Sequence, residues 1–291
     1  MLLNSDKLQD VRFHEDTEES KDILKLEKKL VIDFNTVLVF IKNNFDFTLS
    51  NYSQQLSDIE TLISKDISEL IRSYYQRAYE VGTKYVNEIF STAAFLTGDD
   101  IEFIKGKSDE YTKRFFGRIN NTINTSLDKF YNSLLDIPIG NSFTYHNDDE
   151  IKFFTQRIER TESYLFSSLA IAVVNEALNE ATIRKTRSIL KLQQQNNIFN
   201  AAAVNPDLLD SLENIIPEPT NVGFQRTMAG TTFSQILENL RLLFKTAKDE
   251  FVCPICKPLE NKTYLIEDPN VPIIPGGTHL NCRCRIILIS L

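Results

Sequence analysis

All four cysteines of this 291-residue chain lie within 32 residues of one another. Cys253 and Cys256 form a C-x-x-C pair, Cys282 and Cys284 form a C-x-C pair, and His279 stands just before the second pair. Zinc in structural sites takes about four nitrogen or sulfur ligands, commonly as two close pairs that the fold brings together. The spacing therefore predicts one structural Zn²⁺ ion, which would anchor a segment too small to build its own core.

Two other uses of these cysteines stay open at the sequence level. Reduced thiols can pack in a core, and pairs of thiols can form disulfides. C-x-C is less usual than C-x-x-C as a ligand pair, so the sequence does not say which of His279, Cys282 and Cys284 would bind. A catalytic cysteine is disfavoured, because His14, His146 and His279 are the chain's histidines and His279 alone is near a cysteine in sequence.

The rest of the chain has the pattern of long helices. Apolar residues recur every three or four positions over long stretches, and the 291 residues include 9 glycines and 9 prolines, so helix breakers are few. We expect a mainly α fold, with a long-helix body and a small α+β module that carries the cysteines. The expected organisation is a flexible arm (1–20), a helical body (21–195), a linker or excursion (196–230) and the cysteine module (231–291).

Local signals refine this organisation. "TGDD" at 97–100 interrupts the helical pattern and is typical of a helix start, and Gly82 within a helical stretch indicates close contact with another helix. "SSLAIAVVNEAL" is about 12 residues long, too short to span a bilayer, and predicts a buried helix. "LRLLFKTAKDEFVCPIC" and "RCRIILISL" are β-branched or aliphatic runs beside turn residues and predict short strands.

Charge and targeting signals narrow the functional classes. The net charge is −8, which argues against a chain that binds nucleic acid through overall basicity. The first 22 residues have no apolar core of the signal-peptide type, so we expect synthesis in a reducing cytoplasm and no membrane association. Clustered cysteines in that compartment hold a metal more often than they form disulfides.

The cysteine segment also resembles the end of a known family. "FKTAKDEFVCPICKPLENKTY" followed by "PIIPGGTHLNCRCRIIL" is similar to the ending of the phage head morphogenesis family, the Mu F-like minor head proteins. That ending reads as an aromatic residue, T-x-x-D-x-x-V-C-P-x-C, L-x-G-K, a proline-rich stretch and H-P-N-C-R-C. This chain departs from it at Phe244 (usually Trp), Asn261 (usually Gly) and Leu280 (usually Pro). The matching positions are Thr246, Asp249, Val252, Cys253, Pro254, Cys256, Leu259, Lys262, His279, Asn281, Cys282, Arg283 and Cys284.

A second match lies upstream of the cysteines. "RIERTESYLFSSLAIAVVNEA" resembles the R-T-E helix of the same family, with Arg160, Thr161 and Glu162 as its central residues. Arg160 and Glu162 are two positions apart and do not face each other on a helix. We therefore expect one of them to link this helix to the cysteine module by a hydrogen bond or ion pair, and we assign neither a catalytic role.

The resemblance implies a function that composition does not. It implies a minor capsid protein in the virion of a tailed phage, inside the head or at the portal vertex, acting in head assembly and in genome packaging or ejection. Its implied partners are the portal protein and, as a further candidate, the major capsid protein. It implies no enzymatic activity. The alternatives are a virion-carried effector enzyme and a zinc-dependent nucleic-acid-binding protein, although the chain has no G-x-x-x-x-G-K-[ST] or H-E-x-x-H motif.

Two groups of basic residues are candidates for contact with packaged DNA. The segment "IRKTRSILK" has no acidic residue, and Arg283 and Arg285 flank Cys284. Such side chains can bind phosphates. They can equally form a solvated helix face, or pair with nearby acidic residues in the case of the second group. The candidate phosphate contacts are Arg184, Lys185, Arg187, Arg283 and Arg285.

Overall fold

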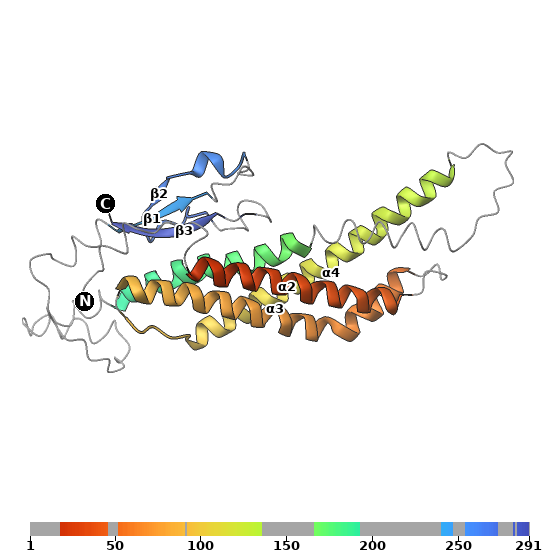
Figure 1. Ribbon diagram of the computed structural model, residues 1–291, viewed down its shortest axis with the longest axis horizontal. Coiled ribbons are helices and arrows are strands. Elements are labelled where there is room, and N and C mark those ends of the chain that lie inside the picture. The colour runs from red at the N-terminus through yellow and green to blue at the C-terminus, as the bar shows by residue number, and fades with distance from the viewer. Residues whose placement is uncertain are drawn as a thin grey trace, which may run out of the picture.

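The protein consists of a bundle of long helices with a small antiparallel sheet on one side, as the computed structural model shows (Figure 1). The structure describes residues 18–45, 52–90, 92–135, 166–192, 240–246, 254–272, 282 and 284–290. The prediction of a mainly helical protein with a small strand-containing cysteine module is confirmed. The predicted linker (196–230) and all but the last three residues of the predicted arm (1–20) lie outside the described residues.

Three labelled helices make up most of the bundle. They are α2 (Glu18–Asn43), α3 (Tyr52–Phe90) and α4 (Gly98–Leu135). At 1.5 Å per residue, the 39 residues of α3 extend roughly 58 Å. The far end of α4 projects beyond the other helices in Figure 1. No helix in the described part of the chain is long and apolar enough to cross a membrane.

A fourth helix, residues 166–192, is the most deeply enclosed, and we call it the buried helix. It contains the segment that the sequence predicted to be buried, and Leu169, Val173 and Ala177 along it have no exposed surface. Phe166 at its start meets Phe34 of α2 and Phe115 of α4, with ring centroids 5.7 and 5.1 Å away. Centroid distances of this size are typical of favourable aromatic pairs. The three rings therefore join three helices at one point.

The helix boundaries follow local signals. At the start of α4, the backbone N–H of Thr97 donates to Asp100 Oδ2 at 2.8 Å, and the backbone N–H of Asp100 donates to Thr97 Oγ1 at 3.3 Å. This reciprocal pair satisfies two amides that the first turn of a helix leaves without partners. The prediction that "TGDD" marks a helix start is confirmed, since α4 begins at Gly98.

The sheet has three strands in the order β2-β1-β3. Strand β1 (Leu240–Lys245) pairs antiparallel with β3 (Arg285–Ser290) and with the two-residue β2 (Thr263–Tyr264). Alternate residues of β1 are buried, which is the pattern of a strand with one face on a core. Strand β1 covers the first six residues of the predicted run "LRLLFKTAKDEFVCPIC", whose residues 254–256 form a turn instead, and β3 covers "RIILIS" within the predicted "RCRIILISL". Strand β2 was not predicted.

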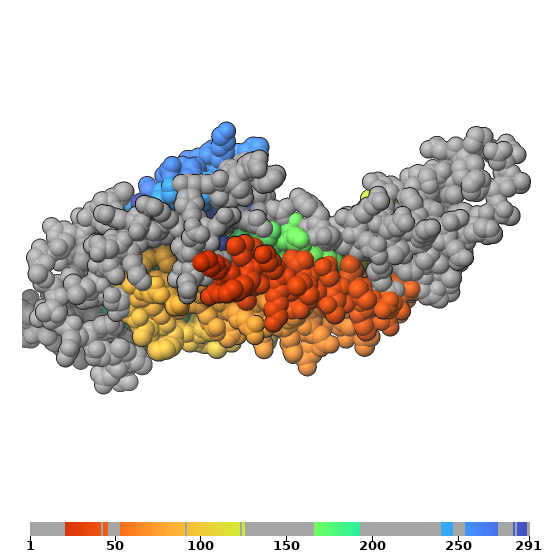
Figure 2. All heavy atoms as spheres, in the orientation of Figure 1, coloured from red at the N-terminus to blue at the C-terminus, as the bar shows by residue number. Residues whose placement is uncertain are grey.

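The sheet packs on the helices through a second hydrophobic core. Its buried members include Phe90 of α3, Leu190 of the buried helix and Phe244 of β1. In the space-filling view the sheet module stands out from one side of the helical bundle, and α2 forms much of the bundle surface that faces the viewer (Figure 2). The buried helix contributes to both cores and so connects the bundle with the module.

Candidate metal centre

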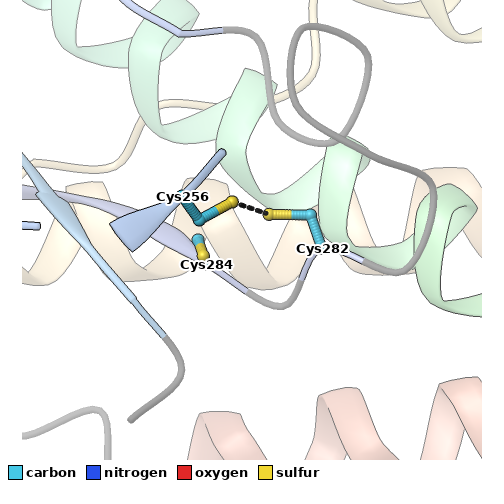
Figure 3. Close-up of side chains that lie close together, drawn as sticks. All are labelled: Cys256, Cys282 and Cys284. Atoms are coloured by element: carbon cyan, nitrogen blue, oxygen red, sulfur yellow. Dashed lines mark hydrogen bonds between the residues drawn. The ribbon is translucent and has the colours of Figure 1, made fainter. Parts of the chain in front are cut away.

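Three cysteines from two separate parts of the module converge beneath the sheet. Cys256 lies in the turn that leads into the 3₁₀ helix η2 (Lys257–Leu259), and Cys282 and Cys284 lie just before β3. Their Sγ atoms are within 4.8 Å of one another, and all three residues are buried (Figure 3). Three buried thiols in this arrangement could bind a metal ion.

The distances fit thiol ligands and not a disulfide. The Sγ atoms of Cys256 and Cys282 are 3.5 Å apart, whereas a disulfide bond is about 2.05 Å long. A tetrahedral zinc with Zn–S bonds of about 2.3 Å places its sulfur ligands about 3.8 Å apart. The separation is therefore close to what a shared ion requires. The alternative of disulfides does not describe the three cysteines that the structure includes.

The local electrostatics disfavour thiolates unless a cation is present. The pKa of Cys284 is raised far above its usual value by its hydrogen bond with Cys282, by burial and by the neighbouring Cys256. A metal cation removes this penalty, since it binds the thiolate forms directly. The cluster can thus hold a soft or borderline metal ion, and a hard oxygen-seeking ion such as Mg²⁺ does not suit sulfur ligands.

A fourth ligand would come from outside this trio. Cys253 precedes Cys256 by three residues and His279 precedes Cys282 by three. Both were predicted as ligands, and both lie outside the described residues. The structure therefore brings together three of the five predicted ligands.

Two asparagines of the buried helix hold the backbone of the cysteine segment. Asn175 Nδ2 donates to the carbonyl oxygen of Cys282 at 2.8 Å, and Asn179 Nδ2 donates to that of Cys284 at 3.4 Å. Asn179 Oδ1 also accepts from the backbone N–H of Ile286 at 3.0 Å. Both asparagines are buried, so these bonds form where water does not compete.

A neighbouring face of the buried helix carries a second polar group. Glu176 is buried, accepts a hydrogen bond from the Tyr111 hydroxyl at 2.6 Å and pairs with Lys107 at 2.6 Å. Burial and the nearby Glu176 raise the pKa of Glu180, one turn further along. Glu176 is paired across helices with Tyr111 and Lys107 of α4, so it bears on the stability of the bundle.

The predicted phosphate contacts on the buried helix have partners within the protein. Lys185 is buried and forms an ion pair with Asp100 and a hydrogen bond to the Phe95 carbonyl at 2.8 Å. Arg187 donates to the carbonyl oxygens of Ile266 and Asp268 at 2.8 and 3.3 Å. The prediction is therefore wrong for Lys185, whose ammonium is enclosed, and Arg187 is already used in fixing the module.

The remaining basic candidates differ in their surroundings. The Arg184 guanidinium lies over the Phe103 ring at 4.1 Å, 4.0 Å from Asp100, with 35% of its side chain exposed. Arg285 donates to Asn175 Oδ1 and is half-buried. Arg283 lies outside the described residues. Arg184 thus keeps part of its side chain exposed, and its use as a phosphate contact stays a prediction.

The predicted link through Arg160 and Glu162 also lies outside the described residues. Within the described part of the chain, Asn175, Asn179 and Arg187 connect the helical body to the module. The sequence carried a signal for the asparagines: they interrupt the apolar run "AIAVVNEALN" one helical turn apart. Polar residues on the buried face of a helix require partners, and a pair at this spacing indicates one shared partner segment.

Comparison with known proteins adds no relative. No protein-family model, no curated protein and no solved structure matches this chain.

Proposed function

We propose that this chain is a structural and interaction protein, a minor head protein of a tailed phage that acts at or near the portal vertex in head assembly and genome packaging or ejection. The observation that carries the proposal is the clustering of Cys256, Cys282 and Cys284, three of the four cysteines of the resembling motif, at one buried point. Residues that are separated in the sequence but meet at one buried point are best explained by a shared structural role.

Two departures from the family pattern support the same reading. Asn261 stands where the family has glycine, and its φ of 61° is in the left-handed region that glycine, and after it asparagine, adopts most readily. Its backbone N–H donates to the Phe244 carbonyl at 3.0 Å and so ties the turn before β2 to strand β1. Phe244 stands where the family has tryptophan and is fully buried under the sheet. Both substitutions keep the physical property of the family residue.

The proposed cofactor is one structural Zn²⁺ ion. Cys256, Cys282 and Cys284 would hold it together with Cys253 or His279. The ion would contribute to the folding of the module, because its binding free energy is available only in the folded state. It would stabilise the thiolate ligands and supply no catalytic step.

The zinc is tested on the purified full chain by metal analysis and thermal unfolding. We expect about one zinc per chain, and Cys256→Ser and Cys282→Ser should lose most of it and unfold at lower temperature. Cys253→Ser and His279→Ala, compared side by side, identify the fourth ligand as the variant that loses the ion. Unchanged metal content and unfolding temperature in Cys256→Ser would leave packed thiols as the better account.

The location is tested by quantitative mass spectrometry of DNA-filled particles of the source phage. A minor head protein at the portal vertex should occur at a fixed ratio to the portal protein, in far fewer copies than the major capsid protein. A low copy number without a fixed ratio would indicate a loosely packaged or ejected protein. Absence from particles would overturn the proposal and favour the effector enzyme or the zinc-dependent nucleic-acid binder.

A further inference from the structure

We propose that metal binding at the cysteine cluster and docking of the module on the buried helix are one linked equilibrium, with Asn175 and Asn179 as the positioning residues. This inference rests on the proposed metal site and adds a specific role for two side chains of the helical body. The asparagines would not touch the ion. They would act on its ligands through the backbone that carries them.

The geometry of the contact supports this role. Asn175 and Asn179 are four residues apart, about 6 Å along a helix, and Cys282 and Cys284 are two residues apart, about 6.6 Å along an extended chain. The two spacings match, so each asparagine reaches the carbonyl of one cysteine. The buried helix and the segment from Cys282 to Ile286 thus run side by side in the same direction.

These bonds fix the cysteines more tightly than contact with the side chains alone would. The carbonyls of Cys282 and Cys284 lie on either side of position 283, so holding both sets the backbone that directs the two thiols toward Cys256. Arg285 adds a bond to Asn175 Oδ1, and the Ile286 amide adds one to Asn179 Oδ1. Ligand positions held from outside the ligand set are a recognised determinant of metal affinity.

Linkage follows from thermodynamics. If docking on the asparagines organises the ligands, the metal must in turn favour docking by the same factor. Loss of the metal should then loosen the contact between the segment from Cys282 to Ile286 and the buried helix, while the helices themselves stay folded. The Ile286 amide is a direct reporter, because its hydrogen-bond acceptor is the Asn179 side chain.

The first test is zinc affinity of the full chain, measured by competition with a chromogenic chelator, for wild type, Asn175→Ala and Asn179→Ala. We expect each variant to bind zinc about tenfold more weakly or worse. The matched control is Tyr111→Phe, which removes a buried hydrogen bond to Glu176 on the same helix but away from the cysteines. Its zinc affinity should stay within about twofold of wild type while its stability falls.

The second test uses wild-type protein, so it does not depend on a variant that folds. Hydrogen exchange at Ile286 is measured with zinc bound and after removal of zinc by a chelator, and the cobalt-substituted protein is checked for a thiolate absorption band. We expect faster exchange at Ile286 without metal, and a thiolate absorption band in the cobalt-substituted wild-type protein.

The outcomes separate the two proposals. The linkage would be overturned if wild type and both asparagine variants bound zinc equally, or if hydrogen exchange at Ile286 did not change on metal removal. Either result would leave the proposed metal site unaffected. A wild-type chain that binds neither zinc nor cobalt would overturn the metal site and the linkage with it.

Discussion

Gly82 of α3 packs directly against the buried helix. A Cβ at this position would lie 2.7 Å from the Leu178 carbonyl oxygen and 2.8 Å from the Ala181 Cβ. Both distances are too short for van der Waals contact, and one of the opposing atoms is backbone, which cannot rotate away. The close approach of the two helices therefore depends on the missing side chain.

This predicts opposite effects for the same substitution at two glycines. Gly82→Ala should destabilise the protein by about 1–3 kcal/mol, because the helices must separate. Gly106→Ala on α4 has no atom within 4 Å of the new Cβ and should stabilise by up to about 1 kcal/mol through helix propensity. Chemical denaturation of the two variants gives the comparison. Equal effects would show that Gly82 is not a packing constraint.

Residue-scale prediction from the sequence succeeded where the signal was local. The contact at Gly82 and the helix start at "TGDD" follow from the residues themselves, and the structure confirms both. The convergence of three cysteines could be expected from their spacing. The hydrogen-bond partners of Asn175 and Lys185 could not be predicted, because each partner lies about a hundred positions away in the chain and is brought close only by the fold.

The start of α4 illustrates how one carboxylate can stabilise several elements. Asp100 caps α4, accepts a hydrogen bond from the Tyr79 hydroxyl of α3 at 2.6 Å and pairs with Lys185 of the buried helix. Burial alone would raise the pKa of Asp100. The hydrogen bonds from Lys185, Tyr79 and Thr97 outweigh burial and hold that pKa well below its usual range.

Asp100→Asn should therefore cost about 3–5 kcal/mol at neutral pH, because it leaves the Lys185 charge buried without its partner. The pH dependence should change as well. The folded pKa of Asp100 is below the unfolded value of about 3.9, so its contribution is complete above that pH and falls as the pH drops below it. Wild type should lose stability below about pH 4 more steeply than Asp100→Asn.

Urea denaturation from neutral pH down into the acid range measures both effects. The matched control is Asp99→Asn, an exposed neighbour in the same helical turn, which should have a much smaller effect. Adding Lys185→Met to Asp100→Asn should recover part of the loss, since it removes the unpaired charge. A parallel pH profile for wild type and Asp100→Asn would contradict the assigned role of Asp100.

At the scale of elements, long periodic helices and the two six-residue strands were predictable, since each carries its pattern within a single run. Strand β2 was not, because two residues are too few to show alternation and their pairing is set by the turn at Asn261. The strand order β2-β1-β3 could not be predicted from the sequence either. It depends on how the segment after Cys256 folds back beside β1.

At the scale of the whole molecule, the described residues form two hydrophobic cores that share two helices. One core lies within the bundle, and the other lies between the sheet and the ends of α3 and the buried helix. Because the same helices serve both, unfolding of the module should expose surface on the bundle. We expect the described parts to unfold together in one cooperative transition.

Phe244→Ala tests this cooperativity. Phe244 is fully buried beneath the sheet, so its truncation should cost about 3–5 kcal/mol and lower the denaturation midpoint of the helices as well as the sheet. Phe95→Ala, where the side chain is 78% exposed, should change stability little. Far-UV circular dichroism and tyrosine fluorescence should give coincident curves. Two separate transitions would show that module and bundle unfold independently.

The buried helix also constrains the order of events during protein synthesis. Its asparagines find their partners only in residues 282–286, more than a hundred codons downstream. Until the ribosome has translated and released that stretch, the face that carries Asn175 and Asn179 remains without its native hydrogen bonds. The buried helix therefore cannot complete its native contacts before that stretch leaves the ribosome, and the nascent chain presents its unfinished polar-lined face to chaperones while residues 193–282 are being translated.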